Sequence, residues 1–286
     1  GGTQANFTII SSILKPYQGV ISAKTGHINI HETGAIEATG HKVLALPCSV
    51  DGKISAKQIE DACISHYNDA SFEHMVQPGM VYISQPTEIG AIYSKSELTQ
   101  INEVCKKYNM PLFVDGARLG YALASSENDV SLHELCGLCD VFYIGGTKCG
   151  ALFGEAVVIV NDNLKKDFRY NIKQNGGMMA KGRLLGLQFQ CLFEDNTYVE
   201  ICQKAVAQAK LITNTCSQMG YPLFTSSPTN QQFIIFDDNI LEKLSEKYVF
   251  SYWERIDDSH SAVRICTSWA TTDENVNQLI NDIKSL

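Results

Sequence analysis

Two apolar segments that each lead into a charged residue constrain the fold of this chain more than any other feature. Leu112–Val114 is followed by Asp115, and Val141–Ile144 is followed, after a Gly-Gly-Thr turn, by Lys148. Short apolar runs bounded by turn residues are typical of strands buried in a parallel sheet. Ligands of such sheets bind at the carboxyl ends of the strands. We therefore expect Asp115 and Lys148 to face one shared crevice.

The rest of the chain alternates between short apolar segments and amphipathic ones, which predicts an α/β fold with a mostly parallel sheet covered on both faces. A small C-terminal domain is expected from about residue 196, which divides the chain into residues 1–195 and 196–286. The expected strands are Gly19–Ser22, Val43–Leu46, Met80–Ser84, Phe233–Phe236 and Ala262–Thr267, and the expected helices are Gly2–Leu14, Ser55–Asn68, Ser96–Asn109 and a long stretch from about Lys181 to Met219.

The amino-acid composition of the chain limits which classes of molecule it could bind. The chain has 286 residues, is 44% hydrophobic and carries a formal net charge of −8. No basic block suggests a nucleic acid or an anionic membrane as partner, and no apolar run approaches the ~20 residues of a membrane span. Ten cysteines without regular spacing indicate reduced thiols in a cytoplasmic protein. The CxxC pair Cys136 and Cys139 is interpreted as structural, and no metal site is expected.

The surroundings of the two charged residues distinguish them from ordinary surface groups, since most charged residues that follow a strand cap a helix or lie in solvent. Asp115 is followed by a small residue on each of the next two positions, and Lys148 lies among four glycines between two apolar segments. Burial would lower the pKa of a lysine and free its amine to form a Schiff base.

Three segments together resemble a known family: VDGARLGYAL from Val114, GGTKCGALFGEAVV from Gly145, and the TxxGxIY pattern of Thr87–Tyr93. They resemble the threonine aldolase / β-eliminating lyase family of pyridoxal-phosphate (PLP) enzymes, especially its phenylserine-aldolase-like branch. The similarity runs from Gly1 to about Ile280. It implies the PLP-dependent fold type I, like aspartate aminotransferase, with a small α+β C-terminal domain. It also implies an N-terminal arm before Gly1 and a homodimer or homotetramer.

The same resemblance implies which residues would bind the cofactor. Lys148 would hold PLP through its amine, and Asp115 would keep the pyridine nitrogen protonated. Gly2 and Thr3 would bind the phosphate at a helix start. His27 would stack on the ring.

Further roles follow from the resemblance, with some alternatives open. Arg118 and Arg264 would bind the substrate carboxylate. Met179 stands near the position of an arginine that reaches a neighbouring subunit's phosphate, so Lys181 or Arg183 could substitute or form a solvated helix face. Many relatives carry histidine where this chain has Glu88, which could take a substrate proton or only hydrogen-bond a loop.

The function implied is cleavage of the Cα–Cβ bond of a β-hydroxy-α-amino acid, of threonine or phenylserine type, to glycine and an aldehyde. Glu88 or His27 would take the β-hydroxyl proton. The alternatives are a PLP-dependent β-eliminating lyase, an aminotransferase, or a non-catalytic protein of the same fold. A plain nucleotide-binding domain is disfavoured because the chain has neither a G-x-G-x-x-G pattern after the first strand nor a P-loop.

Overall fold

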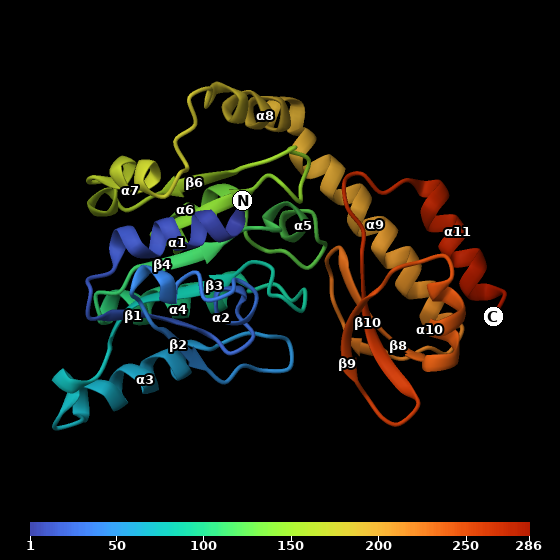
Figure 1. Cartoon of the computed structure of the whole chain (residues 1–286), viewed down its shortest axis with the longest axis horizontal. Coiled ribbons are helices and arrows are strands. Elements are labelled where there is room, and N and C mark those ends of the chain that lie inside the picture. The colour runs from blue at the N-terminus through green and yellow to red at the C-terminus, as the bar shows by residue number, and fades with distance from the viewer.

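A six-stranded sheet forms the centre of the larger part of the molecule in the computed structural model, which describes residues 1–286 (Figure 1). Its strands lie in the order β2-β1-β3-β4-β5-β6. The first five pair in parallel, and β6 runs antiparallel to β5 at the edge. The mostly parallel sheet is therefore confirmed. The strands are β1 (Gln18–Ala23), β2 (Val43–Leu46), β3 (Gln77–Ser84), β4 (Leu112–Asp115), β5 (Val141–Gly145) and β6 (Glu155–Ile159).

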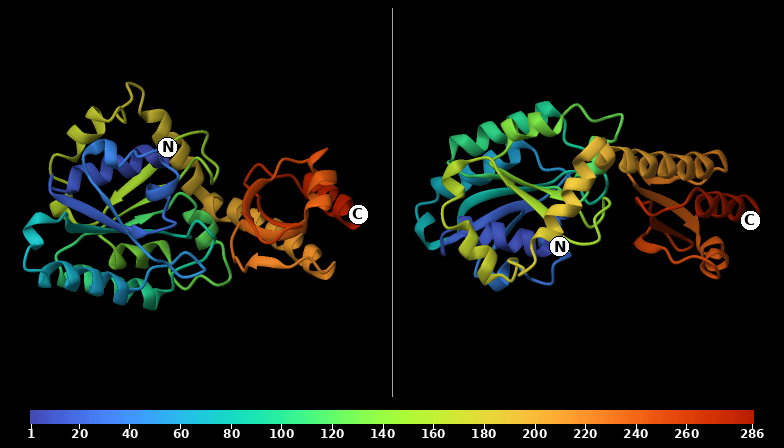
Figure 2. Two further views of the ribbon diagram at one scale, coloured as in Figure 1. Left: turned by 60° about the horizontal axis from the view of Figure 1, so that its bottom comes forward. Right: turned by 90° about the horizontal axis from the view of Figure 1, so that it is seen from above.

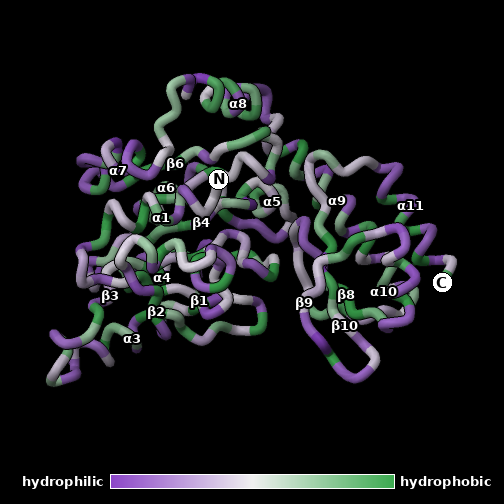
Figure 3. Tube along the Cα trace, in the orientation of Figure 1, coloured by the Kyte–Doolittle hydropathy of each residue, from purple (hydrophilic) through white to green (hydrophobic).

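Helices cover both faces of this sheet because its strands are apolar on both sides. One face packs on α3 (Ala56–Asn68), α4 (Lys95–Lys107), α5 (Leu119–Leu123), α6 (Leu132–Leu138) and the first half of α9 (Thr197–Gln218). The other packs on α1 (Gly2–Ile13), α2 (His27–Ile30) and the start of α7 (Phe168–Gln174). In Figure 3, hydrophobic and hydrophilic residues alternate along helices such as α7 and α8 (Arg183–Phe193), which is the pattern of a helix with one apolar face.

Local sequence signals set the helix starts. Ser55, Ser94 and Ser131 each cap a helix. The serine hydroxyl accepts a hydrogen bond from the backbone amide three residues on, and the serine amide donates to the Gln or Glu side chain of that same residue. This capping box satisfies two of the amides that a helix start leaves without partners. Because Ser94 is the cap, α4 begins at Lys95, one residue before the predicted start at Ser96.

The long helical stretch expected from about Lys181 to Met219 is present, but it is not continuous. The structure has two helices, α8 (Arg183–Phe193) and α9, separated by the short 3-10 turn η4 (Glu194–Asn196). Asp195 and Asn196 adopt positive φ angles of 51° and 62°, which breaks the helical hydrogen bonds. Asn and Asp tolerate this conformation better than most residues, so they are suited to the break.

A second, antiparallel sheet of order β7-β8-β10-β9 forms the smaller part of the molecule, which Figures 1 and 2 show joined to the larger one by α9. Its elements are β7 (Leu223–Thr225), β8 (Gln231–Asp237), α10 (Asp238–Ser245), β9 (Ser251–Arg255), β10 (His260–Cys266) and α11 (Asp273–Lys284). The first half of α9 packs in the large core and its second half in the small one. The boundary at residues 195 and 196 remains a prediction. None of the helices is both long and apolar enough to cross a membrane.

Candidate active site

A polar cavity of about 240 Å³ lies at the carboxyl ends of β3, β4 and β5 and beside the N-termini of α1 and α2. The structure brings together seven of the ten predicted site residues there. The lining consists of Gly2, Thr3, His27, Ser84, Pro86, Thr87, Glu88, Asp115, Ala117, Arg118, Tyr143 and Lys148. Residues far apart in sequence meet because parallel strands deliver their ends to one edge of the sheet.

Lys148 is half-buried in this cavity, and its amine has no hydrogen-bond or ion-pair partner. Burial, followed by the positive charge of Arg118, lowers its pKa, while the Asp115 carboxylate opposes the effect. The amine is thus both accessible and easier to deprotonate than that of a surface lysine. This is the state that nucleophilic attack on a carbonyl requires.

The backbone around Lys148 is held by groups outside the cavity. Glu155 on β6 accepts hydrogen bonds from the Gly146 amide (2.7 Å) and the Thr147 hydroxyl (3.0 Å). The Tyr121 hydroxyl donates to the Lys148 carbonyl. These bonds fix the turn from which the lysine side chain extends.

Asp115 is buried, and its carboxylate accepts four hydrogen bonds. Oδ2 accepts from the Tyr82 hydroxyl (2.6 Å) and from Asn6 Nδ2 (3.0 Å). Oδ1 accepts from the Tyr143 hydroxyl (2.5 Å) and from the Ala117 amide (2.9 Å). Burial and the neighbouring carboxylate raise the pKa of both phenols well above the usual range, so both remain donors.

His27 is the first residue of α2 and also lines the cavity. Its Nδ1 lies 2.7 Å from Glu32 Oε1, which also accepts a hydrogen bond of 2.7 Å from Asn6 Nδ2. The Glu32 carboxylate holds the imidazole so that its other nitrogen is available to the cavity.

Glu88 lies in the loop after β3 with its carboxylate in the same cavity. Oε1 accepts hydrogen bonds from the His27 amide (2.9 Å) and the Ser84 hydroxyl (2.7 Å). Burial raises its pKa, and the bond from Ser84 opposes that effect. A carboxyl with a raised pKa that lines a cavity is a candidate for proton transfer to or from a bound substrate.

The N-terminus of α1 closes one end of the cavity. Gly2 and Thr3 line it, and the first amides of an α-helix have no acceptor within the helix. A Cβ atom on Gly2 would lie 2.9 Å from the Tyr143 hydroxyl oxygen, so a larger residue would crowd that phenol. The amides and the positive end of the helix dipole suit an anion such as phosphate.

The two predicted carboxylate-binding arginines lie in different places. Arg118 is half-buried in the cavity and forms no ion pair with the protein. Arg264 on β10 instead lines a separate hollow between the two parts of the molecule, with Thr25, His31 and Trp253. Its Nε is buried without a hydrogen-bond partner, and its Cζ lies 5.7 Å from the centre of the Trp253 ring.

Lys181 and Arg183 are exposed at the start of α8 and do not line the cavity of their own chain. Exposed apolar side chains also occur on α8, before its start and in the turn before β6, where the Leu152 and Phe153 amides donate to Gln188 of α8. This surface, which we call the α8 surface, comprises Leu152, Phe153, Met179, Leu184, Leu187 and Phe193. No group of three or more His, Cys, Asp or Glu side chains is placed to hold a metal ion.

Sequence reasoning missed the groups that hold the predicted residues in place, chiefly Asn6, Tyr82, Ser84 and Tyr143. A weak signal for them exists. Tyr82 and Ser84 are two residues apart on a strand and therefore point to the same face. Asn6 lies one helical turn beyond Gly2. Nothing in the sequence reveals that Asn6, Tyr82 and Tyr143 converge on Asp115, or that Ser84 donates to Glu88.

Fold comparisons define the class of protein. The structure matches that of a Thermus thermophilus aspartate aminotransferase with a TM-score of 0.69 at 14% identity, covering 100% of this chain and 74% of that one. The fold is thus fold type I of the PLP-dependent enzymes, as the sequence predicted. A Leishmania major threonine aldolase matches far more closely, with a TM-score of 0.95 at 43% identity, covering 100% of this chain and 82% of that one.

The sequence comparisons define the family. The chain belongs to the β-eliminating lyase family, whose profile matches residues 1–239. It is 31% identical over 293 aligned positions to a low specificity L-threonine aldolase from a Pseudomonas species, covering 100% of this chain and 81% of that protein. A low specificity L-threonine aldolase from Pseudomonas aeruginosa is 29% identical over 99% of this chain. The predicted membership is confirmed, and members of this family typically use PLP.

Proposed function

We propose that this protein is a PLP-dependent lyase that cleaves the Cα–Cβ bond of a β-hydroxy-α-amino acid, giving glycine and an aldehyde. The observation that carries the proposal is a partner-free lysine amine in a small cavity that also holds a four-donor carboxylate, a carboxyl with a raised pKa and an unpaired arginine. The names of the relatives support the substrate class, since they are low specificity L-threonine aldolases.

The residues present fit PLP. Lys148 would hold its aldehyde carbon, the amides of Gly2 and Thr3 would bind its phosphate, and Asp115 would face its pyridine nitrogen. His27 would stack on the ring. The group, when bound, supplies an electron sink for the pair released when a bond to Cα breaks.

The chain's own residues then perform the positioning and proton steps. Arg118 binds the substrate carboxylate with two parallel hydrogen bonds and so fixes the rotation of the substrate about its N–Cα bond. That rotation selects which bond to Cα is cleaved. Glu88, or His27 held by Glu32, takes the proton from the β-hydroxyl as the aldehyde carbonyl forms. The same group returns the proton when glycine is completed.

Arg264 joins the site in this proposal if the small domain moves toward the large one. Its guanidinium has an unpaired Nε and no carboxylate partner, which suits binding of the substrate carboxylate alongside Arg118. The hollow that it lines has a volume of about 670 Å³ and separates it from the cavity of Lys148.

A homodimer or homotetramer is part of the proposal. The α8 surface exposes six apolar side chains, and contiguous apolar patches on soluble proteins commonly mark interfaces. A second copy docked there would bring Lys181 and Arg183 of one chain toward the phosphate site of the other. The protein would act in the cytoplasm.

The test is direct. Purified protein reconstituted with PLP is treated with borohydride and digested, and the reduced cofactor is located by peptide mapping; we expect it on Lys148. Release of glycine from L-threonine, L-allo-threonine and phenylserine is then measured. Label on another lysine, or no glycine from any of the three substrates, would refute the proposal.

A further inference from the structure

A continuous row of oxygen atoms runs beneath the cavity from Glu88 to Asp115. Ser84 Oγ lies 2.7 Å from Glu88 Oε1 and 3.2 Å from the Tyr82 hydroxyl oxygen. The Tyr82 hydroxyl lies 2.6 Å from Asp115 Oδ2. All three separations are within hydrogen-bond range. The carboxyl group of Glu88, in the loop after β3, is thereby linked through two hydroxyls to the carboxyl group of Asp115 at the end of β4.

Counting protons shows why Ser84 matters. Its hydroxyl has one hydrogen but two acceptors within reach, Glu88 and Tyr82. The Tyr82 hydrogen is already donated to Asp115, so Tyr82 offers Ser84 only a lone pair. Ser84 can therefore donate to one neighbour at a time.

The state of Glu88 decides which one. When Glu88 is ionised, it can only accept, and Ser84 donates to it. When Glu88 is protonated, it can donate to Ser84 Oγ, and Ser84 is then free to donate to Tyr82. In that second arrangement every hydroxyl in the row donates in the same direction, toward Asp115, and such chains strengthen one another.

We infer that Ser84 and Tyr82 are positioning residues that couple the protonation of Glu88 to the hydrogen bonding of Asp115. No heavy-atom bond changes in the switch. One proton arrives at Glu88, and the Ser84 hydroxyl rotates from Glu88 to Tyr82. The inference rests on the proposed function insofar as Glu88 is a base there and Asp115 the ring-facing acid. When the base accepts the substrate proton, the carboxylate next to the cofactor site gains a stronger donor.

Other charged groups act on Glu88 as well, and the test must separate them from the hydroxyl row. The groups that face it are His27 from α2, Asp115 from β4, and Arg118 and Lys148 from the loops beyond β4 and β5, with Tyr93 behind the loop. Their Coulomb effects do not depend on the Ser84 hydroxyl. Substitutions that delete single hydroxyls therefore isolate the row.

The experiment is a pH titration of the full chain without added cofactor. The protonation of Glu88 is monitored through its infrared carboxyl band, which is assigned by its loss in Glu88→Gln. Ser84→Ala removes a donor to the ionised form and should raise the pKa of Glu88 by about one unit. Tyr82→Phe removes the acceptor that Ser84 uses in the protonated state and should lower the pKa of Glu88. The two changes are expected in opposite directions.

Matched variants make the result decisive. Tyr143→Phe deletes an equally buried donor to Asp115 that lies outside the row, so it should leave the titration of Glu88 unchanged. Ser84→Thr keeps the hydroxyl and should restore the wild-type value. Shifts in the same direction for Ser84→Ala and Tyr82→Phe, or an equal shift in Tyr143→Phe, would overturn the inference. Because the readout needs neither substrate nor cofactor, it is independent of whether glycine is released.

Discussion

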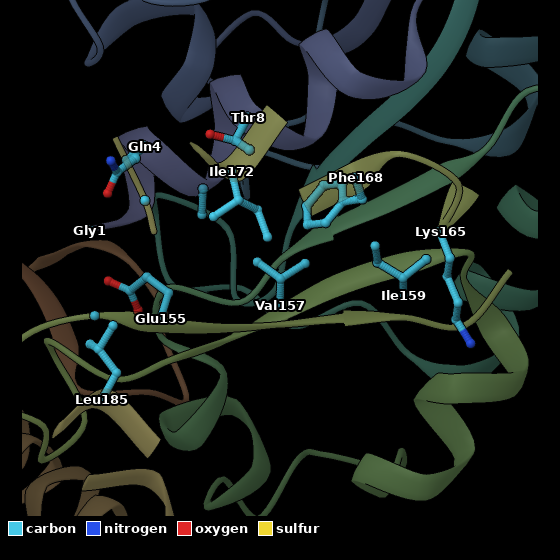
Figure 4. Close-up of a pocket in the computed structure, with 13 residues that line it drawn as sticks. Gly1, Gln4, Thr8, Glu155, Val157, Ile159, Lys165, Phe168, Ile172 and Leu185 are labelled. Carbon is cyan, nitrogen blue, oxygen red and sulfur yellow. The ribbon is translucent and has the colours of Figure 1, made fainter. Parts of the chain in front are cut away.

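Two of the hollows in the larger part of the molecule differ in size and in chemistry. The larger, of about 500 Å³, lies between α1, α7 and the edge strand β6, where Val157, Ile159, Phe168 and Ile172 form an apolar lining (Figure 4). The smaller, of about 240 Å³, is lined by a free amine, an unpaired guanidinium and four other ionisable side chains. A choice made on size alone would favour the larger hollow over the one that holds these groups.

Their positions on the sheet explain the difference. The larger hollow lies against the side of the edge strand, where alternating side chains present apolar groups to the helices. The smaller one lies at the strand ends, where the backbone turns and polar residues are tolerated at low cost. We therefore expect substitutions in the smaller hollow to change chemistry, and those in the larger one to change stability.

The largest effect should come from Lys148. Replacing it with alanine removes the only group that can hold the cofactor aldehyde, and we expect glycine release to fall by about 10³-fold or more. Lys148→Arg keeps the positive charge but forms no imine, so it should be equally inactive. The measurement is glycine formation together with the visible absorbance of the reconstituted protein. An active Lys148→Arg variant would contradict the expectation that the chemistry depends on the lysine in the smaller hollow.

Phe168→Ala should show the opposite pattern. Phe168 is 8% exposed at the start of α7 in the larger hollow, and its truncation should lower the free energy of unfolding by about 3 kcal/mol. Activity per folded molecule should stay within about twofold of the wild-type value, because Phe168 does not line the smaller cavity. Urea unfolding measures the free energy of unfolding. Glycine release divided by the concentration of cofactor-loaded sites measures the activity per folded molecule. Loss of activity without loss of stability would show that the larger hollow takes part in the reaction.

Arg118→Ala should weaken substrate binding. The loss of a charge-assisted hydrogen-bond pair to a carboxylate costs about 2 kcal/mol, or roughly 30-fold in kcat/KM. Arg118→Lys keeps the charge but not the paired geometry, so it should recover only part of the loss. Steady-state kinetics with phenylserine separate KM from kcat. An unchanged kcat/KM in Arg118→Ala would assign carboxylate binding to Arg264 alone.

Glu88→Gln should have the smallest effect. We expect it to change how the free energy of unfolding of the cofactor-free protein depends on pH. Burial raises the pKa of Glu88 above its ordinary 4.5, so the folded state binds more protons between the two values. The stability that this contributes is full below pH 4.5 and is lost as the pH rises through the folded pKa. Relative to wild type, the unfolding free energy of Glu88→Gln should therefore rise from pH 4 to pH 8.

Urea unfolding at several pH values measures this trend. Glu73→Gln, at an exposed position in the short turn η2 (Phe72–His74), is the matched control and should show no such trend. A flat difference for Glu88→Gln would contradict the burial of that carboxyl.

Most of the strands and helices could be predicted from local sequence patterns. Strands β2 and β5 were predicted at or within a residue of their bounds, because short apolar runs between turn residues have few other stable arrangements. The start of α4 was predicted one residue too late because several serines and threonines near it could serve equally well as the cap. The break at Asp195 and Asn196 was missed because both residues are also compatible with a helix, and only packing against two cores decides between them.

The sequence by itself determined the chemistry that is available, because residue type fixes which side chains donate, accept or titrate. It placed Asp115 after one strand and Lys148 after another, and the rule for parallel sheets brought them to one edge. It could not show that Tyr82, Tyr143 and Asn6 donate to the same carboxylate, or that Ser84 stands between two acceptors. These relations depend on strand register and helix packing, which join residues far apart in the chain, and distances below 3 Å between such residues exist only in the folded molecule.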